Sequence, residues 1–225
     1  MKSNFKIHIL VFFLSIAVIL LIYPHIFYKY FVLQMPFSDQ APQSYFADWT
    51  VIISAMKCKL QGYDVFLDNP CDFWNRRHVY GSILLFLPYS TNLNNLYSIY
   101  IPIFFNLLFL FVVISHINFK KVEQVLIYVL FIFSPATLLA VERFNIDILI
   151  FLILLLICHL RSNLFKSILI VIISLAKFYP AITSIIFLFK GINKKNLSYF
   201  LISVAFIALI FFLDNDNLTK VFSNI

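Results

Sequence analysis

Charged side chains interrupt the apolar segments of this chain at a few well-defined places. The sequence ERFNID (142–147) separates two apolar runs with almost no loop between them, and Lys177 lies within a third run, shortly before Tyr179 and Pro180. An ionisable group at bilayer depth costs about 2.5–3.5 kcal/mol on insertion scales, so such residues need a reason to be there. Carboxylates can exchange protons with a substrate and cations can bind phosphate, which makes both segments candidates for chemistry.

The amino-terminal half adds further charged residues to this set. Asp39 and Asp48 follow the first apolar run and could act as proton acceptors, while Arg76 and Arg77 could bind phosphate. An ordinary first-turn position for Asp48 and a solvated loop for the two arginines are the simpler interpretations. Apolar residues recur at helical spacing after Asp48, which predicts an amphipathic helix on or near the membrane surface: Trp49, Ile52, Ile53, Met56 and Leu60.

The segment 142–147 also has a purely structural interpretation. Asn145 can cap a helix that begins at Ile146, with Asp147 in the favourable first turn, and Arg143 could pair with Asp147 or Glu142. A tight turn does not require charges at Glu142 and Arg143, so these two residues favour a functional role. Lys177 could extend its ammonium group to the membrane interface or bind a lipid phosphate, and its position fits both.

Composition limits the class of protein strongly. The chain is 62% hydrophobic and 12% charged, whereas soluble globular chains are roughly 45–50% apolar and about 25% charged. We therefore predict an all-α, polytopic membrane protein. The net charge of +7 does not indicate nucleic-acid binding, because short basic loops of membrane proteins set topology or contact anionic lipid.

Apolar runs and basic loops predict the topology of a single transmembrane domain over residues 1–225. Lys2 and Lys6 place the amino terminus in the cytoplasm, and the first span, 7–28, leads to an extracytoplasmic loop region over 34–95. About five further spans are expected within 97–213, namely 97–117, 122–141, 145–159, 167–189 and 197–213. In this arrangement, all the candidate site residues face the extracytoplasmic side.

The segment 167–189 allows two interpretations. One continuous span would put Lys190, Lys194 and Lys195 outside, against the positive-inside rule. A hairpin of two half-spans, broken near 177–180, returns them to the cytoplasm. Pro180 breaks or kinks a helix in either case, and we prefer the hairpin.

The three cysteines have no metal-ligand spacing. Cys58 and Cys71 share the first long loop and could form a disulfide if that loop is extracytoplasmic, but two free thiols are the favoured interpretation; Cys158 stands apart. With 3 glycines in all, a glycine-rich phosphate loop is excluded, and no serine-hydrolase, dinucleotide or zinc motif is present. No metal or other cofactor is expected.

Two of these segments together resemble motifs of a known family. ERFNID, followed by a span and then LAKFYP (175–180), resembles the Glu-Arg-Gly-Asn-like and Lys-x-x-Pro motifs of polyprenyl-phosphate-mannose-dependent mannosyltransferases of glycosyltransferase family 87, in the GT-C superfamily. Upstream, Asp48-Trp49 and KLQGYD (59–64) are similar to the first loop of that family. Phe144 stands where the family usually has glycine.

The resemblance implies a GT-C-like bundle with a long first extracytoplasmic loop that carries amphipathic helices. It implies transfer of a sugar, mannose or a related hexose, from a polyprenyl-phosphate donor to an envelope glycan, glycolipid or protein, at the extracytoplasmic face of the plasma (inner) membrane. Asp48 would take the acceptor proton, with Asp39 as its substitute. The implied donor-phosphate ligands are Arg143 and Lys177, with Arg76 or Arg77 possible, and the implied supporting residues are Glu142, Asn145, Asp147 and Tyr179.

Two alternatives remain at this point. A transporter or flippase for a lipid-linked sugar would use the same basic residues to bind phosphate without chemistry. A truncated, non-catalytic membrane protein is the other alternative, because family members have more spans. The partners expected in every case include membrane lipid, and nucleic acid is not among them.

Overall fold

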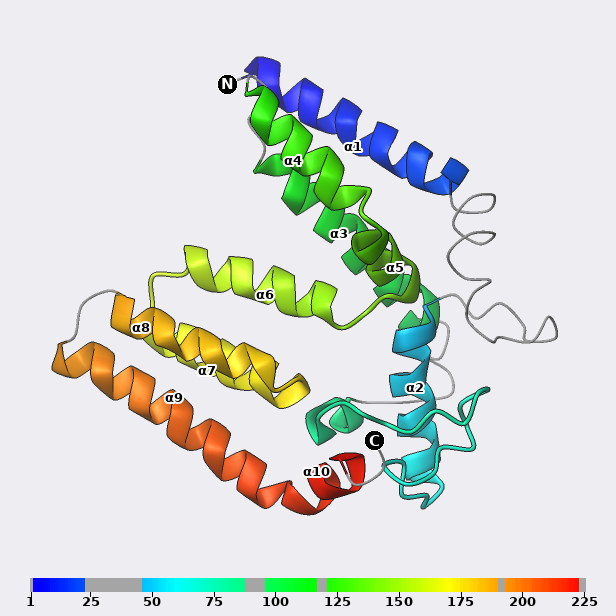
Figure 1. Ribbon diagram of the computed structural model, residues 1–225, viewed down its shortest axis with the longest axis vertical. Coiled ribbons are helices and arrows are strands. Elements are labelled where there is room, and N and C mark those ends of the chain that lie inside the picture. Colours follow the sequence, from blue (N-terminus) through cyan, green and yellow to red (C-terminus); the bar gives the residue numbers. More distant parts are fainter. Residues whose placement is uncertain (1, 23–45, 88–95, 117–120, 190–192, 223–225) are drawn as a thin grey trace. The chain divides into compact units, whose positions relative to one another are not determined.

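The part of the protein that the structure describes is mainly helical. The computed structural model describes residues 2–22, 46–87, 96–116, 121–189 and 193–222 (Figure 1). These residues form helices joined by turns and loops and contain no β-strand, which confirms the all-α prediction. Asp39, one of the two predicted proton acceptors, lies outside the described residues.

The chain divides into two compact units. The first contains residues 1–47 and 99–145, and the second contains residues 48–98 and 146–225. The division separates the predicted site residues, because Glu142, Arg143 and Asn145 belong to the first unit while Asp48, Asp147 and Lys177 belong to the second. Each unit is described by itself below.

The first unit is built from four helices: α1 (Lys2–Ile22), α3 (Ile101–Ser115), α4 (Val122–Ile132) and α5 (Pro135–Arg143). Helix α1 packs against α3. A buried hydrogen bond of 2.6 Å joins the hydroxyl groups of Ser15 on α1 and Tyr128 on α4. Because both hydroxyls are removed from water, pairing them avoids the cost of burying an unsatisfied polar group.

The span expected over 122–141 is not one continuous helix. Helices α4 and α5 meet at an angle of 53°. Ser134 ends the first helix and caps the second, since its Oγ accepts a hydrogen bond from the backbone N–H of Thr137, and Pro135 follows at the first helical position. The Ser-Pro start signal explains the break, and the assignment of 122–141 to one span stays a prediction.

The second unit centres on α7. This helix (Asn163–Ala176) contacts α6 (Asp147–His159), the 3₁₀ helices η2 (Ser82–Phe86) and η5 (Tyr179–Ile185), and α9 (Lys194–Leu213). The hydroxyls of Ser167 on α7 and Ser203 on α9 form a buried 2.6 Å hydrogen bond. The remaining elements are α2 (Ala47–Leu60), the short α8 (Ile186–Phe189), α10 (Asn215–Phe222), and η4 (Leu96–Tyr100), a π-helical turn that continues into α3.

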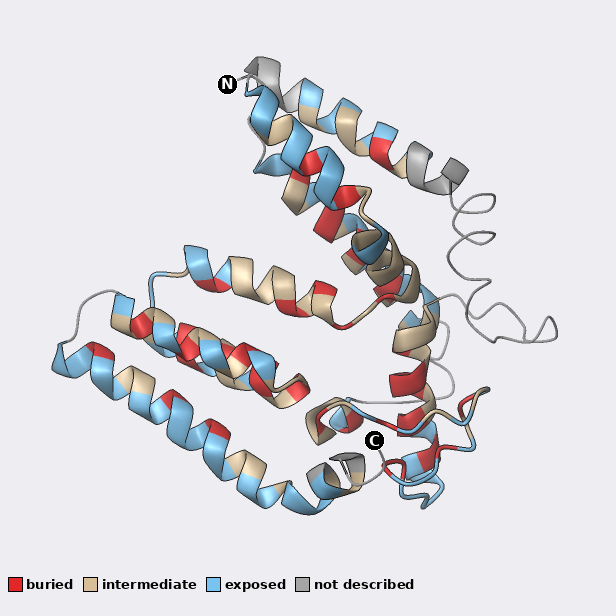
Figure 2. Cartoon of the chain, in the orientation of Figure 1, coloured by how far each residue is buried: buried red, intermediate tan, exposed pale blue. Residues whose placement is uncertain are grey.

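Helix α2 is more deeply buried than a helix lying on a membrane surface. Four of the five residues in its predicted apolar stripe are buried, but Leu60 is 72% exposed. Val51, Ala55 and Cys58, outside that stripe, are buried as well (Figure 2). The helix was predicted correctly; the loop after α2 covers further sides of it, and its position relative to the membrane surface stays a prediction.

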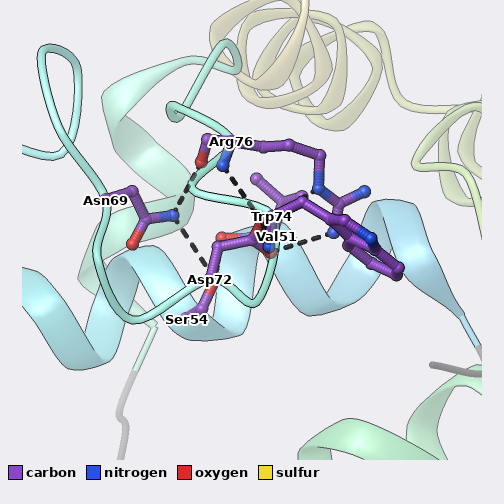
Figure 3. Close-up of polar contacts among 6 residues, drawn as sticks. All are labelled: Val51, Ser54, Asn69, Asp72, Trp74 and Arg76. Atoms are coloured by element: carbon purple, nitrogen blue, oxygen red, sulfur yellow. Dashed lines mark hydrogen bonds and ion pairs between the residues drawn. The ribbon is translucent and has the colours of Figure 1, made fainter. Parts of the chain in front are cut away.

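That covering loop is fastened to α2 at two points. A disulfide joins Cys58 on α2 to Cys71, so the expectation of two free thiols was wrong. The buried side chain of Asn69 donates hydrogen bonds to the Arg76 carbonyl (2.9 Å) and to Ser54 Oγ on α2 (3.4 Å), as Figure 3 shows. The two cysteines are thirteen residues apart, and only the folded loop brings them together.

Apolar side chains are exposed along several helices. Among the described residues, two helices, Leu96–Ser115 and Lys194–Leu213, are long and apolar enough to cross a membrane, and α4 with α5 would make a third as one broken span. Figure 2 shows exposed positions along the length of α9. Leu201, Phe206 and Phe212 are among these exposed residues. Such surfaces suit contact with lipid. The assignment of 7–28, 34–95 and the five spans within 97–213 to membrane and loop stays a prediction.

Candidate functional site

The clearest polar cluster of the second unit lies where α7 ends. Helix α7 stops at Ala176, and Lys177 takes an extended conformation (φ −145°, ψ 149°) before η5 begins at Tyr179. Pro180 occupies one of the first positions of η5, where its missing N–H costs no hydrogen bond. The segment LAKFYP (175–180) therefore creates a break, which places the Lys177 side chain at the end of helix α7.

The chain reverses direction at this break. Helix η5 packs against α7, and α8 continues back along it (Figure 1). The hairpin interpretation of 167–189 requires such a reversal but is not tested by it. How the hairpin lies in the membrane stays a prediction.

Asp147 and Tyr179 hold the ammonium group of Lys177 in place. Lys177 Nζ lies 2.7 Å from Asp147 Oδ1, and the Tyr179 hydroxyl donates a hydrogen bond of the same length to that oxygen. The Lys177 side chain is 22% exposed and that of Asp147 is 47% exposed. The cluster joins residues thirty positions apart and remains open to a ligand.

Aromatic rings complete the surroundings of Lys177. Its Nζ lies 5.5 Å from the ring centroid of Tyr80 and 5.9 Å from that of Tyr179. Aromatic faces attract cations within about 6 Å, so both rings attract the Lys177 ammonium group. The site is thus a positioned cation with a carboxylate on one side and two phenol rings nearby.

Gly81 brings the Tyr80 segment against the end of α7. The Gly81 N–H donates a 3.1 Å hydrogen bond to the Ala176 carbonyl. A Cβ at Gly81 would lie 1.5 Å from the backbone oxygen of Leu175, so no other residue fits without displacing the helix end. This glycine, one of three in the chain, explains how the loop after α2 reaches Lys177.

In the first unit, the segment Glu142–Asn145 ends helix α5. Phe144 adopts the left-handed conformation (φ 46°, ψ 61°), while the N–H groups of Phe144 and Asn145 bond to the carbonyls of Val141 and Ala140. This is a Schellman arrangement, for which glycine is the favoured residue. The geometry gives a physical reason for the glycine usual at this position in the family that the sequence resembles.

Phe144 occupies this conformation because its side chain is fully buried. Its ring packs edge-on against Phe46 and stacks with Phe105. Asn106 on α3 donates a 2.8 Å hydrogen bond to the Val141 carbonyl, which further fixes the end of α5. Glu142 and Arg143, both half-buried, therefore lie at a well-fixed helix end.

The predicted cap at Asn145 is not observed. Helix α6 begins at Asp147, and Ile146 occupies the cap position without a side-chain hydrogen bond. Asn145 is instead part of the Schellman turn through its backbone N–H. Asp147 does lie in the first turn of α6, as expected, and it pairs with Lys177.

The other predicted ligands have different surroundings. Asp48 lies in the first turn of α2 and is half-buried, while Arg77 is exposed. Arg76 forms an ion pair with buried Asp72 and its guanidinium lies 4.4 Å from the centroid of the Trp74 ring (Figure 3). These contacts favour a structural role for Arg76. Its assignment as a phosphate ligand, and the convergence of Asp48 with Arg143, stay predictions.

Sequence reasoning missed the residues that assemble the second unit. No sequence motif marks the residues that make these contacts. They are Tyr80 near Lys177, Gly81 against α7, and Ser82, whose Oγ donates a 2.8 Å hydrogen bond to Asp214. The scarcity of glycine was an available signal, because a glycine kept in such a chain marks a backbone constraint.

Comparison with known proteins identifies the family. The family model of glycosyltransferase family 87 matches residues 81–224, more than half of the chain. The match begins at Gly81 and includes 142–147 and Lys177, whereas Asp48, Arg76 and Arg77 precede it. No curated protein and no solved structure matches the chain. The chain, a membrane protein with a GT-C-like helical fold, belongs to glycosyltransferase family 87.

Proposed function

We propose that the protein transfers a hexose, mannose or a related sugar, from a polyprenyl-phosphate donor to a hydroxyl group of an envelope glycan, glycolipid or protein. The observation that carries this proposal is the Lys177–Asp147–Tyr179 cluster at the end of α7. It offers a positioned cation within the segment matched by the family model.

Lys177 suits the leaving group of this reaction. When the bond from the sugar C1 to the phosphate oxygen breaks, negative charge grows on the departing polyprenyl phosphate and must be stabilised. An ammonium group can donate three hydrogen bonds, so Lys177 can hold Asp147 and a phosphate oxygen at the same time. Asp147 keeps the ammonium group aimed, and Tyr179 fixes the carboxylate.

Asp48 is the proposed proton acceptor. As the acceptor oxygen attacks C1 on the face opposite the phosphate, its proton passes to the Asp48 carboxylate, the C1–O–phosphate bond breaks, and the anomeric configuration inverts. Asp39 is the substitute base. Arg143 would add a second cation for the phosphate, with Glu142 and Asn145 orienting it, and Arg77 is a further candidate ligand.

The disulfide supports an extracytoplasmic position for the catalytic face. Disulfides persist in oxidising compartments and are rare in the cytoplasm. The Cys58–Cys71 bond lies in the α2 helix and loop region that carries Asp48 and Tyr80. We therefore propose that this region faces outward from the plasma (inner) membrane, with the amino terminus in the cytoplasm.

A transfer assay with the purified full chain and defined polyprenyl-phosphate sugars tests the function. Asp48→Asn, Arg143→Ala and Lys177→Ala should each lower transfer at least about a hundredfold, while Lys195→Ala, an exposed lysine in the first turn of α9, should not. Transfer that survives Asp48→Asn overturns the assignment of the base. Movement of the labelled donor across vesicle membranes without transfer would instead identify a flippase.

A further inference from the structure

A polar pocket lies in the second compact unit, apart from the Lys177–Asp147 pair. It has a volume of about 300 Å³, and residues of the loop after α2, of η2 and of the start of α10 line it. The lining residues used in this argument are Tyr63, Asp64, Phe66, Phe86, Asp214 and Asn217. The volume is at the lower end of the roughly 300–1,000 Å³ range of small-molecule sites, which suits a single small ring.

Hydrogen bonds fix the polar wall of this pocket. Asp214 accepts a 2.8 Å hydrogen bond from Ser82 Oγ on one carboxylate oxygen and a 2.6 Å bond from Asn217 Nδ2 on the other. Each carboxylate oxygen can accept more than one bond, and the Asn217 amide has a second N–H and a carbonyl oxygen. The wall is therefore a preorganised set of acceptors and donors at close spacing.

Aromatic rings provide the other wall. Tyr63 and Phe86 are largely exposed, and Phe66 is buried beneath the pocket surface. The Lys59 ammonium group lies 4.3 Å from the centroid of the Phe86 ring and holds that side chain against α2. Exposed aromatic faces opposite amide and carboxylate groups suit a ligand that has apolar C–H faces and a rim of hydroxyls.

The charges around the pocket are balanced. Lys59 and Asp214 line it with opposite charges, and Lys220 neutralises the lining Asp64 through a 2.7 Å ion pair. A phosphate or sulfate would find no excess of positive charge here, in contrast with the cation at Lys177. A neutral sugar residue matches this pocket better than an anionic headgroup.

A smaller cavity lies beside this pocket and is partly lined by the segment around Lys177. It has a volume of about 180 Å³, shares Ser82, Phe86 and Asp214 with the polar pocket, and is otherwise lined mainly by apolar side chains. Leu175 and Phe178, on either side of Lys177 in the sequence, belong to that lining. A molecule in the polar pocket would thus lie next to Leu175 and Phe178. It would leave Lys177, the proposed phosphate ligand, available to the donor.

We propose that the polar pocket is a subsite for one neutral sugar residue of the acceptor. This assignment rests on the proposed sugar transfer, in which the donor phosphate engages Lys177. Asn217 and Asp214 bind the hydroxyls, and Tyr63 and Phe86 cover the ring. Through this subsite the enzyme would recognise acceptors that already carry a sugar.

Direct binding of a simple hexoside tests this subsite. We would titrate the full chain in lipid nanodiscs with methyl α-mannopyranoside and follow saturation-transfer NMR. Asn217→Ala and Phe86→Ala should each weaken binding at least about fivefold, because each removes one wall of the pocket. Asn215→Ala, an exposed asparagine on the same helix, should change binding less than about twofold and serves as the matched control.

Separate outcomes distinguish this inference from the proposed function. Hexoside binding that depends on Asn217 and survives Lys177→Ala supports the subsite, even in a preparation that transfers no sugar. Hexoside binding that is absent from the wild type, or unchanged in both pocket variants at unchanged melting temperature, overturns it. Tighter binding of inorganic phosphate than of the hexoside, dependent on Lys59, would also overturn it and mark an anion site.

Discussion

Two clusters in the second unit combine a carboxylate, a cation and an aromatic ring. In the loop after α2, Asp72 pairs with Arg76 at 2.9 Å and the guanidinium lies over Trp74. At the end of α7, Asp147 pairs with Lys177 at 2.7 Å, with the rings of Tyr80 and Tyr179 nearby. The residue types are similar, yet the two clusters differ in how far apart their members are in sequence and how exposed they are.

The Asp72 cluster is satisfied by its own loop. The carboxylate is 3% exposed and accepts four hydrogen bonds, from the backbone N–H groups of Trp74 and Arg76 and from two nitrogens of the guanidinium. The Asp147 carboxylate is 47% exposed, and its partner comes from a distant helix end. Buried local pairing indicates a structural cluster, whereas an exposed pair that joins two elements leaves room for a ligand.

The largest expected difference between the two clusters is the loss of sugar-transfer activity when Lys177 or Arg76 is replaced. We expect Lys177→Ala to lower kcat by two to three orders of magnitude, about 3–4 kcal/mol, because it removes a cation from the departing phosphate. Arg76→Ala should change the activity of the folded enzyme less than about threefold. Equal losses at constant folded fraction would show that Arg76 also binds the donor.

Reduction of the disulfide should affect stability rather than chemistry. Cys58 and Cys71 close a loop of about the length for which a disulfide contributes roughly 3 kcal/mol. A Cys58→Ser/Cys71→Ser double variant should therefore unfold at lower temperature, measured by the thermal unfolding of the purified protein. Cys158→Ser is the control, because that exposed cysteine is not in a disulfide. An unchanged melting temperature would contradict a structural role for the loop.

Removing the charge of Asp72 should destabilise the loop by about 2 kcal/mol, since hydrogen bonds to charged groups contribute about 1.5–3 kcal/mol each and Asn can replace part of the network. Asp72→Asn tests this in denaturant unfolding. The matched Asp147→Asn variant should cost less than about 1 kcal/mol, because exposed ion pairs contribute little. A larger stability loss for Asp147→Asn would reverse the structural and functional assignments of the two clusters.

Some features of the fold and of the candidate site could be predicted from the sequence, and others could not. The helical membrane class and the helix after Asp48 followed from composition and periodicity, and the break at Lys177 followed from Pro180. The Lys177–Asp147 pair did not, because residues thirty positions apart meet only through the packing of α6 and α7. The bend at Ser134-Pro135 could have been predicted from a known helix-start signal.

The cysteine pair illustrates a different limit. Two cysteines in one loop permit a disulfide, but the bond requires the chain between them to fold back on α2. Asn69 and Asp72 provide that fold through hydrogen bonds to Ser54, to Arg76 and to the backbone of Trp74. Such a network depends on three-dimensional geometry that periodicity does not encode.

His78 should make the stability of the loop depend on pH. His78 is buried, and its ring packs edge-on against Phe66. Burial lowers the pKa of His78 from 6.5 to about 4, although a hydrogen bond with the Gly81 carbonyl acts in the opposite direction. The folded state then binds fewer protons than the unfolded state between these values. The stability contribution is fully present well above pH 6.5 and falls by about 1 kcal/mol over the first pH unit below that value.

The check for His78 is a series of unfolding measurements between pH 7.5 and 4.5. The wild type should lose stability through this window, and His78→Gln should show a smaller slope because it cannot gain a proton. The same slope in both proteins would assign the pH dependence to other groups.

The smallest effect should come from the hydroxyl of Tyr179. Tyr179→Phe keeps the ring near Lys177 and removes one hydrogen bond to Asp147, so we expect about a threefold to tenfold loss of transfer, close to 1 kcal/mol. Tyr100→Phe, an exposed tyrosine on η4, is the matched control and should keep full activity. The Asp147→Asn variant should make the loss from Tyr179→Phe disappear, because the hydroxyl acts only through that carboxylate. Additive losses in the double variant would show that Tyr179 contacts the donor directly and is more than a support for Lys177.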